Sequence, residues 1–337
     1  MGKHSPDPAS TPHSALRTPH SLRVLVMGAG AMGSSVGGFL AKAGHRVTLV
    51  GFREHMDAIR KNGLHITGIW GEHRVTTLTP QTDLAGLKAG DFDLIIISEK
   101  SYDTAAAVRK IQHLVDDHTL VCAYQNGLGN AEQIAEVVGW HRTVGARIIY
   151  GVQLPEPGTV KITVIANPSA LGVYTPDAPA EPVRDIAAAI CAAGIPTEYT
   201  DRIATVLWGK IAYNCALNPL SGLLDVPYGV LAETQSTLDI MREVIFELYA
   251  VAAAMKVPLE PATPGAYMTL LVDKLIPPTA AHYASMRADF QSKRRTEIDA
   301  LNGAICRYGQ ERGIPCPTNT MLTRLVRARE YALGIRY

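Results

Sequence analysis

The chain has 337 residues, of which 47% are apolar and 19% charged, so it is long enough for two domains around large cores. Its formal net charge of +1 gives no electrostatic footprint for nucleic acid or for an anionic membrane surface. No apolar run approaches the roughly 20 residues that a membrane span requires. Any binding of an anion must therefore be local.

Residues 1–21 are rich in Pro, Ser and His and lack the apolar region of a secretory signal, which predicts a disordered extension. A transit peptide is the alternative, although arginines are sparse and no amphipathic pattern is visible. The five cysteines are scattered without a CxxC pair, which suits free thiols in a reducing compartment and predicts a cytoplasmic protein. The eleven histidines form no close metal-ligand cluster, so no metal site is predicted.

The first predicted elements form a βαβ unit. Residues 22–27 are an apolar run rich in β-branched side chains, which predicts a buried parallel strand. The run leads directly into a GxGxxG motif at residues 28–33, then into a helix of small and apolar residues, and then into a second strand at residues 46–50. This order is typical of a dinucleotide-binding domain, whereas the alternative, an ordinary glycine-rich turn, would not require the flanking elements.

Each glycine of this motif has a physical role in such a domain. Gly28 allows the tight turn, Gly30 lets the backbone approach a pyrophosphate, and Gly33 allows the helix to pack closely on the strand. The helix N-terminus adds amide donors and a positive dipole. The predicted cofactor-binding turn consists of Gly28, Ala29, Gly30, Ala31, Met32 and Gly33.

The tip of the second strand favours NADP(H) over NAD(H). Enzymes that use NAD usually carry an acid at this place, which binds the adenosine ribose. Here the tip is Gly51, and the guanidinium of Arg53 nearby suits a 2′-phosphate. Glu54 argues in the opposite direction; its other interpretation is a surface charge that opens a helix over residues 54–61.

Two later strands, predicted at residues 93–98 and 119–124, end in polar side chains. Lys100 follows the first strand and Asn126 follows the second. Ligands of open α/β sheets bind beyond the carboxyl ends of the strands, so both residues belong to the same cleft as the glycine turn. The alternatives are a surface charge for Lys100 and a plain Asn-Gly turn for Asn126.

The remaining segments divide the chain into two parts near Thr200. Residues 64–70 and 73–79 predict an antiparallel insertion, residues 143–152, 159–165 and 170–174 continue the sheet, and a helix at 182–193 precedes a last strand at 196–199. Helices are predicted at 203–217, 229–255, 264–275, 293–312 and 318–332. We therefore predict an α/β Rossmann-type, doubly wound NADP-binding domain over residues 22–200 and an all-α substrate and catalytic domain over residues 201–337.

The first helix of the second part carries a polar row in an apolar sequence. Lys210, Asn214 and Asn218 are spaced four residues apart, so they lie along one side of a helix with a drift of roughly 40° per step. In a helix this apolar the row should face a cavity or a partner, where an ammonium and two amides suit a small anionic or carbonyl substrate. The alternative is a solvated lysine with two asparagines that bond to nearby backbone.

Five segments together resemble the ketopantoate reductase (2-dehydropantoate 2-reductase) family. They are GAGAMG at 28–33, KSYDT at 100–104, QNG at 125–127, LWGKIAYNCALNPLSGL at 207–223 and RTEIDALNG at 295–303. Their order and spacing agree with the family from residue 22 to about residue 330. The resemblance implies NADPH-dependent reduction of 2-dehydropantoate to (R)-pantoate, a step toward pantothenate and coenzyme A. A homodimer formed through the helical domain is expected by analogy alone.

The resemblance also implies roles for single residues. Lys210 is expected to be the catalytic acid that protonates the ketone oxygen as hydride arrives from C4 of NADPH, and Glu297 is expected to bind the nicotinamide ribose and help order the site. The residues implied in substrate binding are Asn126, Asn214, Asn218, Tyr228 and Ser285. The residues implied in cofactor binding outside the glycine turn are Arg53 and Lys100 at the adenosine phosphate end, Asn126, Gly151 and Glu297. On pattern alone, Glu297 could equally be an acid in the first turn of the helix predicted over residues 293–312.

One position departs from the family pattern. Where the family has a further substrate-contacting asparagine, ten residues after Asn218, this chain has Tyr228, whose hydroxyl can replace only part of an amide's hydrogen bonding. The alternative is therefore a paralogous reductase of another branched 2-keto acid. A non-catalytic NADP-binding sensor is a further alternative, although a sensor would not need the polar row.

Overall fold

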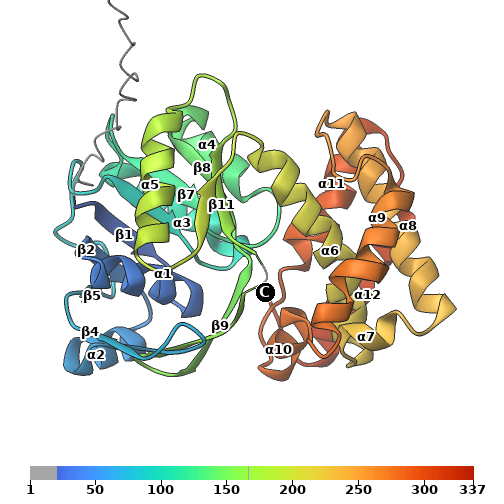
Figure 1. The fold of residues 1–337 in the computed structure, drawn as a ribbon, viewed down its shortest axis with the longest axis horizontal. Helices are drawn as coiled ribbons and strands as arrows, with labels where there is room; N and C mark the ends of the chain where they lie inside the picture. The colour runs from blue at the N-terminus through green and yellow to red at the C-terminus, as the bar shows by residue number, and fades with distance from the viewer. Residues whose placement is uncertain (1–20, 166) are drawn as a thin grey trace, which may run out of the picture.

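The computed structural model describes residues 21–165 and 167–337, which form an α/β part and a helical part side by side (Figure 1). The predicted disordered extension lies, apart from Ser21, outside the described residues. Strands occur only up to Tyr199, and every element from Ile203 onward is helical. No helix among the described residues has both the length and the apolar character needed to cross a membrane.

The main sheet has eight strands in the order β12-β11-β8-β7-β6-β1-β2-β5. Only the β8–β11 pair is antiparallel. The chain leaves β1 toward β2 and β5, and then returns through β6, β7 and β8 on the other side, so the order reverses between β1 and β6. The strands are β1 Arg23–Met27, β2 Arg46–Val50, β5 Thr79–Gln81, β6 Leu94–Ile97, β7 Leu120–Ala123, β8 Thr143–Arg147, β11 Ser169–Val173 and β12 Thr197–Tyr199.

Helices cover both faces of this sheet, which explains why its central strands are apolar without alternation. In β1, Val24 and Val26 pack into the core beneath α1 and α5, whereas Leu25 and Met27 pack into the core beneath α3 and α4. The predicted doubly wound fold is confirmed. The helices of this part are α1 Ala31–Lys42, α2 Arg53–Asn62, α3 Thr104–Ile111, α4 Asn130–Val138 and α5 Ala180–Ala192.

A second sheet of four strands, in the order β4-β3-β10-β9, replaces part of the predicted main sheet. The antiparallel insertion is confirmed as the pair β3 Leu64–Gly68 and β4 His73–Val75. Of the predicted strands at 143–152, 159–165 and 170–174, residues 143–147 and 169–173 do continue the main sheet as β8 and β11. The prediction was wrong for the rest, because β9 Tyr150–Glu156 and β10 Thr159–Ile165 pair with each other, and β10 pairs with β3. The alternation of a strand shows which face is buried but not which sheet it joins.

The helical part begins with the 22-residue helix α6 Ile203–Leu224, seven residues longer than predicted because Pro219 does not end it. The predicted helix over residues 229–255 is instead two helices, and the break comes where Thr234 caps the second through the amide of Thr237. The remaining helices are α7 Tyr228–Leu231, α8 Gln235–Ala254, α9 Pro264–Leu270, α10 Ser285–Gln291, α11 Asn302–Arg312 and α12 Pro317–Ala332. Short helical turns lie at Ser101–Asp103, Gln112–Leu114, Trp140–Arg142, Leu271–Leu275, Pro277–Thr279 and Ile298–Ala300.

The prediction of a helix over residues 293–312 was wrong at its N-terminal end, because the helix α11 begins only at Asn302. The backbone amide of Thr296 donates to the carboxylate of Glu330 at 2.7 Å, and Glu297 precedes a single turn at Ile298–Ala300. These contacts hold the segment away from helical geometry, so Glu297 is not an acid in a first helical turn.

The two parts meet where α6 docks on the main sheet. A Cβ on Gly145 of β8 would lie 2.7 Å from Cγ1 of Ile203, and a Cβ on Gly172 of β11 would lie 2.8 Å from Cβ of Ile203. Two glycines on neighbouring strands thus leave room for the first residue of α6. This close approach brings the polar row of α6 to the carboxyl ends of the strands.

Candidate active site

The glycine turn is bound to the tip of β2 by its own backbone. The amides of Gly28 and Ala29 both donate to the carbonyl of Val50, at 3.1 and 2.8 Å. Gly28 has a φ of +92°, and a Cβ there would lie 2.3 Å from Cγ of Glu99. A Cβ on Gly33 would lie 2.4 Å from Oγ of Ser98. The predicted reasons for these two glycines, a tight turn and close packing, both have a counterpart in the geometry.

Gly30, by contrast, has free space beside it. It caps α1 without a side-chain hydrogen bond, and a Cβ there would meet no heavy atom closer than the carbonyl oxygen of Gly28 at 4.0 Å. The first turn of α1, which includes Ala31 and Met32, carries no acidic residue. The first amides of a helix have no partners within it, so this end of α1 can accept an anion such as a pyrophosphate.

Arg53 lies where the sequence analysis placed it, at the start of α2 just beyond the tip of β2. A Cβ on the neighbouring Gly51 would lie 3.0 Å from the carbonyl oxygen of Ala29, so this tip adjoins the glycine turn. Arg53 and Glu54 are both exposed. Among the described residues the guanidinium of Arg53 has no ion-pair partner, so it can bind a phosphate beside the predicted adenosine position, with the acid of Glu54 next to it.

Lys210 brings together three segments of the chain. Its ammonium donates to Oδ1 of Asn126 at 2.5 Å and to the carbonyl oxygen of Ile148 at 2.5 Å. Asn126 follows β7, and Ile148 follows β8, so the lysine of α6 reaches the carboxyl ends of two parallel strands. Loss of solvation lowers the pKa of Lys210 to about 8, an effect that Glu297 opposes and Arg147 reinforces. An ammonium with this pKa is well suited to give up a proton near neutral pH.

The two asparagines of the polar row differ in burial. Asn214 is half-buried, whereas Asn218 is 5% exposed and its Oδ1 accepts a hydrogen bond of 2.8 Å from the hydroxyl of Tyr228. Tyr228 itself is 3% exposed. The hydroxyl of Tyr228 is thus used by the amide of Asn218, and a direct contact of Tyr228 with substrate stays a prediction.

Glu297 joins the helical part to the α/β part. One carboxylate oxygen accepts from the amide of Ser101 at 3.0 Å, and the other from the ammonium of Lys100 at 3.2 Å. Lys100 also pairs with Asp289 of α10 at 3.2 Å. Burial disfavours the charge of Lys100, but Glu297 and Asp289 outweigh it and raise the pKa of Lys100. In this structure the ammonium of Lys100 thus holds two carboxylates between the parts, and its place at the adenosine end stays a prediction.

Two further predicted site residues are Ser285, whose side chain makes no hydrogen bond with the described residues, and Gly151. Ser285 is exposed as the first residue of α10, a helix whose Met286 and Phe290 lie against Gly222 near the end of α6. Gly151 lies in β9, where a Cβ would come within 2.7 Å of Oγ1 of Thr163, so packing alone gives a reason for glycine. The helix that Ser285 begins thus packs on the end of α6 that follows Asn218.

Two features of the site were missed from the sequence. The carbonyl of Ile148 is a backbone group, which no motif reveals. Asp289 is an acid at 4% exposure, four residues after Ser285 on a short helix. An acid in that place resembles any surface carboxylate until its burial and its cationic partner are known.

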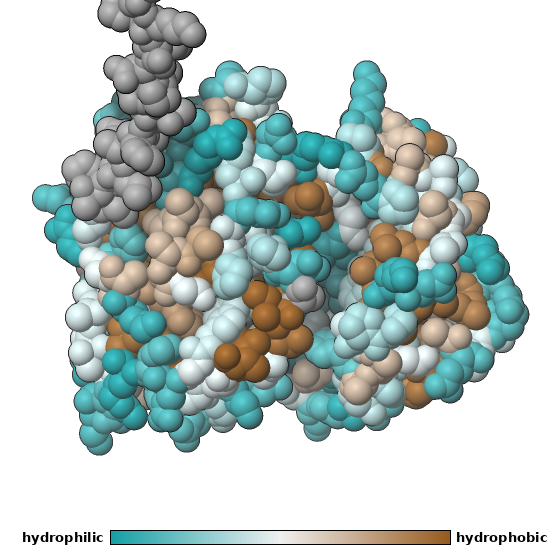
Figure 2. All heavy atoms as spheres, in the orientation of Figure 1, coloured by the Kyte–Doolittle hydropathy of each residue, from teal (hydrophilic) through white to brown (hydrophobic). Residues whose placement is uncertain are grey.

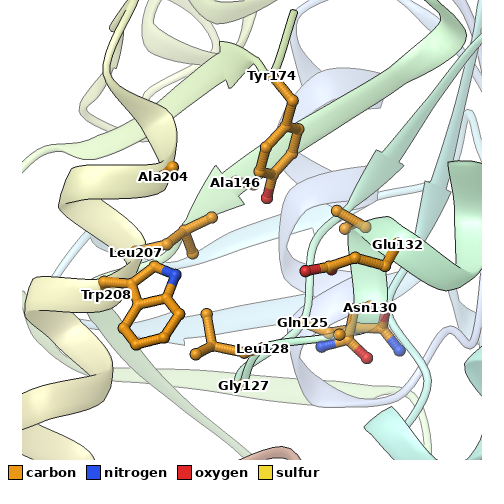
Figure 3. A pocket seen from close by; sticks show the side chains of 13 residues that line it. Gln125, Gly127, Leu128, Asn130, Glu132, Ala146, Tyr174, Ala204, Leu207 and Trp208 are labelled. Atoms are coloured by element: carbon orange, nitrogen blue, oxygen red, sulfur yellow. The ribbon is translucent and has the colours of Figure 1, made fainter. Parts of the chain in front are cut away.

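A small hollow lies between α4, the end of β7 and the first turns of α6 (Figure 3). Its polar lining includes Gln125, Glu132 and Tyr174, and Trp208 points into it from α6. Lys210, Asn214 and Asn218 do not line it. Because Gln125 and Gly127 line the hollow, it lies beside the Lys210–Asn126 contact. Figure 2 shows the outer surface of the two parts, with a shallow recess between them.

Comparison with known proteins gives matches over almost the whole described chain. The family model "Ketopantoate reductase PanE/ApbA" matches residues 24–173, and "Ketopantoate reductase PanE/ApbA C terminal" matches residues 202–330. A 2-dehydropantoate 2-reductase of Aquifex aeolicus is 38% identical over 311 residues, which cover 92% of this chain and 97% of the relative. The chain belongs to the ketopantoate reductase family. The resemblance drawn from the five segments is thereby confirmed, and the protein is an oxidoreductase.

Other ketopantoate reductases and one more distant enzyme share the fold. A 2-dehydropantoate 2-reductase of Pyrococcus horikoshii is 36% identical over 316 residues, which cover 92% of this chain and 98% of the relative. The crystal structure of a family member from Ralstonia eutropha JMP134 superposes with a TM-score of 0.82 at 31% identity, covering 92% of this chain and 99% of that one. A ternary structure of D-mandelate dehydrogenase with NADH and anilino(oxo)acetate superposes with a TM-score of 0.81 at 26% identity, covering 93% of this chain and 99% of that one.

Proposed function

We propose that this ketopantoate reductase family member reduces 2-dehydropantoate to (R)-pantoate with NADPH, as a cytoplasmic step of pantothenate biosynthesis. The observation that carries the proposal is the Lys210 ammonium, held by Asn126 and Ile148 where the polar row of α6 meets the sheet. The names of the Aquifex and Pyrococcus relatives support the substrate. We assign cofactor binding to residues 22–200 and the catalytic lysine to the helical domain of residues 201–337; the homodimer stays a prediction.

The residues of the chain fit a nicotinamide dinucleotide. The open N-terminus of α1 beside Gly30 suits the pyrophosphate, and the D-mandelate dehydrogenase structure supports a nicotinamide cofactor by its bound NADH. Arg53 favours a 2′-phosphate and hence NADPH. When bound, the cofactor supplies a hydride to the ketone carbon of the substrate.

Lys210 completes the reaction as general acid. As the ketone carbon accepts the hydride, its oxygen gathers negative charge, which the ammonium stabilises and then neutralises by giving up one proton from Nζ. The lowered pKa of Lys210 makes this transfer easier at neutral pH. Asn126 orients the ammonium, Asn214, Asn218 and Ser285 bind the oxygens of the substrate, and Glu297 with Lys100 joins the domains beside the cofactor.

A second candidate is the reduction of another branched 2-keto acid. It is favoured by Tyr228, which departs from the family pattern, and by the similarity to D-mandelate dehydrogenase, which acts on a different hydroxy acid. Pocket changes of one contact shift substrate preference by about 1–3 kcal/mol, which is enough to exchange two related acids.

The test is the rate of NADPH oxidation with ketopantoate, ketoisovalerate and pyruvate, repeated with NADH. A kcat/KM for ketopantoate at least about tenfold above the others supports the main proposal, since tenfold corresponds to about 1.4 kcal/mol. A preference for ketoisovalerate supports the second candidate. No turnover of any keto acid by a protein that binds NADPH would contradict both.

A further inference from the structure

Tyr228 is fixed at both ends between two segments of the candidate substrate site. Its hydroxyl donates to Oδ1 of Asn218 at 2.8 Å, and its backbone amide donates to the carbonyl of His282 at 3.0 Å. Its ring lies 5.4 Å from the ring of His282 and edge-on to the ring of Tyr213 at 5.7 Å. His282 is three residues before Ser285, so one tyrosine links Asn218 to the segment that leads to Ser285.

This contact fixes the orientation of the Asn218 amide. An asparagine amide has one oxygen that accepts and one nitrogen that donates, on opposite sides of a planar group. With Oδ1 turned to Tyr228, Nδ2 is turned away from it. Nδ2 has no hydrogen-bond partner among the described residues, and it is not among the polar atoms that are sealed from solvent without one. Nδ2 of Asn218 therefore keeps some contact with solvent and has a free N–H group, as a donor to a ligand requires.

We propose that Tyr228 is a positioning residue that acts through Asn218. By holding Oδ1, it presents the amide N–H of Asn218 to the substrate, so that the site selects 2-keto acids that place an acceptor oxygen, from a carboxylate or a carbonyl, at this point. The inference rests on the proposed function, in which Asn218 binds substrate. In the family pattern, position 228 is an asparagine whose amide is expected to contact substrate. In this chain the buried Tyr228 instead fixes the amide of Asn218.

Tyr228→Phe tests this inference, because the variant keeps the ring and its packing and removes only the hydroxyl. Without the hydroxyl the amide of Asn218 is free to turn, so we expect the KM for the preferred 2-keto acid to rise about fivefold. A change of this size corresponds to the net free energy of one hydrogen bond. The kcat and the KM for NADPH should change less than twofold. Tyr213→Phe is the matched control, since it removes a hydroxyl that bonds Oγ1 of Thr279 at 2.9 Å in the same aromatic cluster; it should leave the KM unchanged.

A double-mutant cycle separates positioning from general loosening of the fold. Asn218→Ala should raise the KM more than Tyr228→Phe does, and adding Tyr228→Phe to Asn218→Ala should have no further effect. Additive effects, or the same rise in KM from Tyr213→Phe, would overturn the positioning role while leaving the proposed function intact. Absence of turnover by the wild-type protein with all three keto acids would contradict both.

Discussion

The glycine turn at residues 28–33 and the cluster of Lys210, Asn126, Lys100 and Glu297, here called the Lys210 centre, are formed by different kinds of groups. Backbone groups and excluded volume shape the turn: two amides bind the carbonyl of Val50, and Gly28 and Gly33 leave no room for a Cβ. In the centre the charged groups are side chains, Lys210 on Asn126 and Lys100 on Glu297, and the backbone adds the carbonyl of Ile148 and the amide of Ser101. A ligand can exchange such side-chain partners without moving the backbone, whereas a side chain added to the turn must move the backbone.

The largest effect is expected from removing the proton donor of the centre. Lys210→Ala should lower kcat about 100- to 10,000-fold, the usual contribution of a general acid, while NADPH still binds because the turn is intact. Single-turnover reduction and NADPH fluorescence measure the two effects separately. Lys274→Ala, which removes an exposed lysine of the helical domain, is the matched control and should keep full activity. Near-normal turnover by Lys210→Ala would rule out its role.

A substitution in the glycine turn should weaken the binding of NADPH, whereas Lys210→Ala lowers kcat. In Gly33→Ala the new Cβ meets Oγ of Ser98 at 2.4 Å and the carbonyl of Gly28 at 2.8 Å, so the turn must shift. We expect the Kd for NADPH to rise about 10- to 100-fold and the stability to fall by about 1–3 kcal/mol. Gly265→Ala, where a Cβ meets nothing within 4 Å, should leave both unchanged. Equal affinity in the two variants would show that the turn does not bind the cofactor.

The pH dependence of kcat/KM tests whether Lys210 is the proton donor. A general acid must be protonated, and burial lowers the pKa of Lys210 to about 8, so kcat/KM for keto acid reduction should be level below pH 8. Above that pH it should fall about tenfold per unit, as the ammonium loses its proton. The reverse oxidation needs the neutral amine and should rise over the same range. A forward profile that stays level to pH 10 would assign the proton to another group.

The smallest effect is expected at the exposed edge of the turn. Arg53→Ala should raise the KM for NADPH about tenfold, or about 1.4 kcal/mol, because a charge-assisted bond to the 2′-phosphate is lost. The KM for NADH, which has no such phosphate, should not change. Arg60→Ala, an exposed arginine at the other end of α2, provides the control. Equal effects on both cofactors would show that Arg53 does not discriminate between them.

Features that depend on residues close together in the chain could be predicted from the sequence, whereas features that depend on distant residues could not. The βαβ unit was predictable because strand, glycine turn and helix each have a local signature. The polar row of α6 was predictable because helical spacing places Lys210, Asn214 and Asn218 on one side, whatever surrounds the helix. The segment before Ile298 was not predictable, since a distant carboxylate, that of Glu330, holds it out of a helix.

The sequence by itself determined the family and the doubly wound sheet. It also determined why residues 28 and 33 are glycines, and that one lysine and two amides lie along one side of an apolar helix. Only the tertiary structure decided which groups these residues meet. It placed the Lys210 ammonium on Asn126, paired Lys100 with two carboxylates, and joined the hydroxyl of Tyr228 to the amide of Asn218. The physical reason is that backbone conformation and periodicity depend on neighbours in the chain, whereas the partner of a charged or polar side chain depends on which distant segment folding brings within about 3 Å.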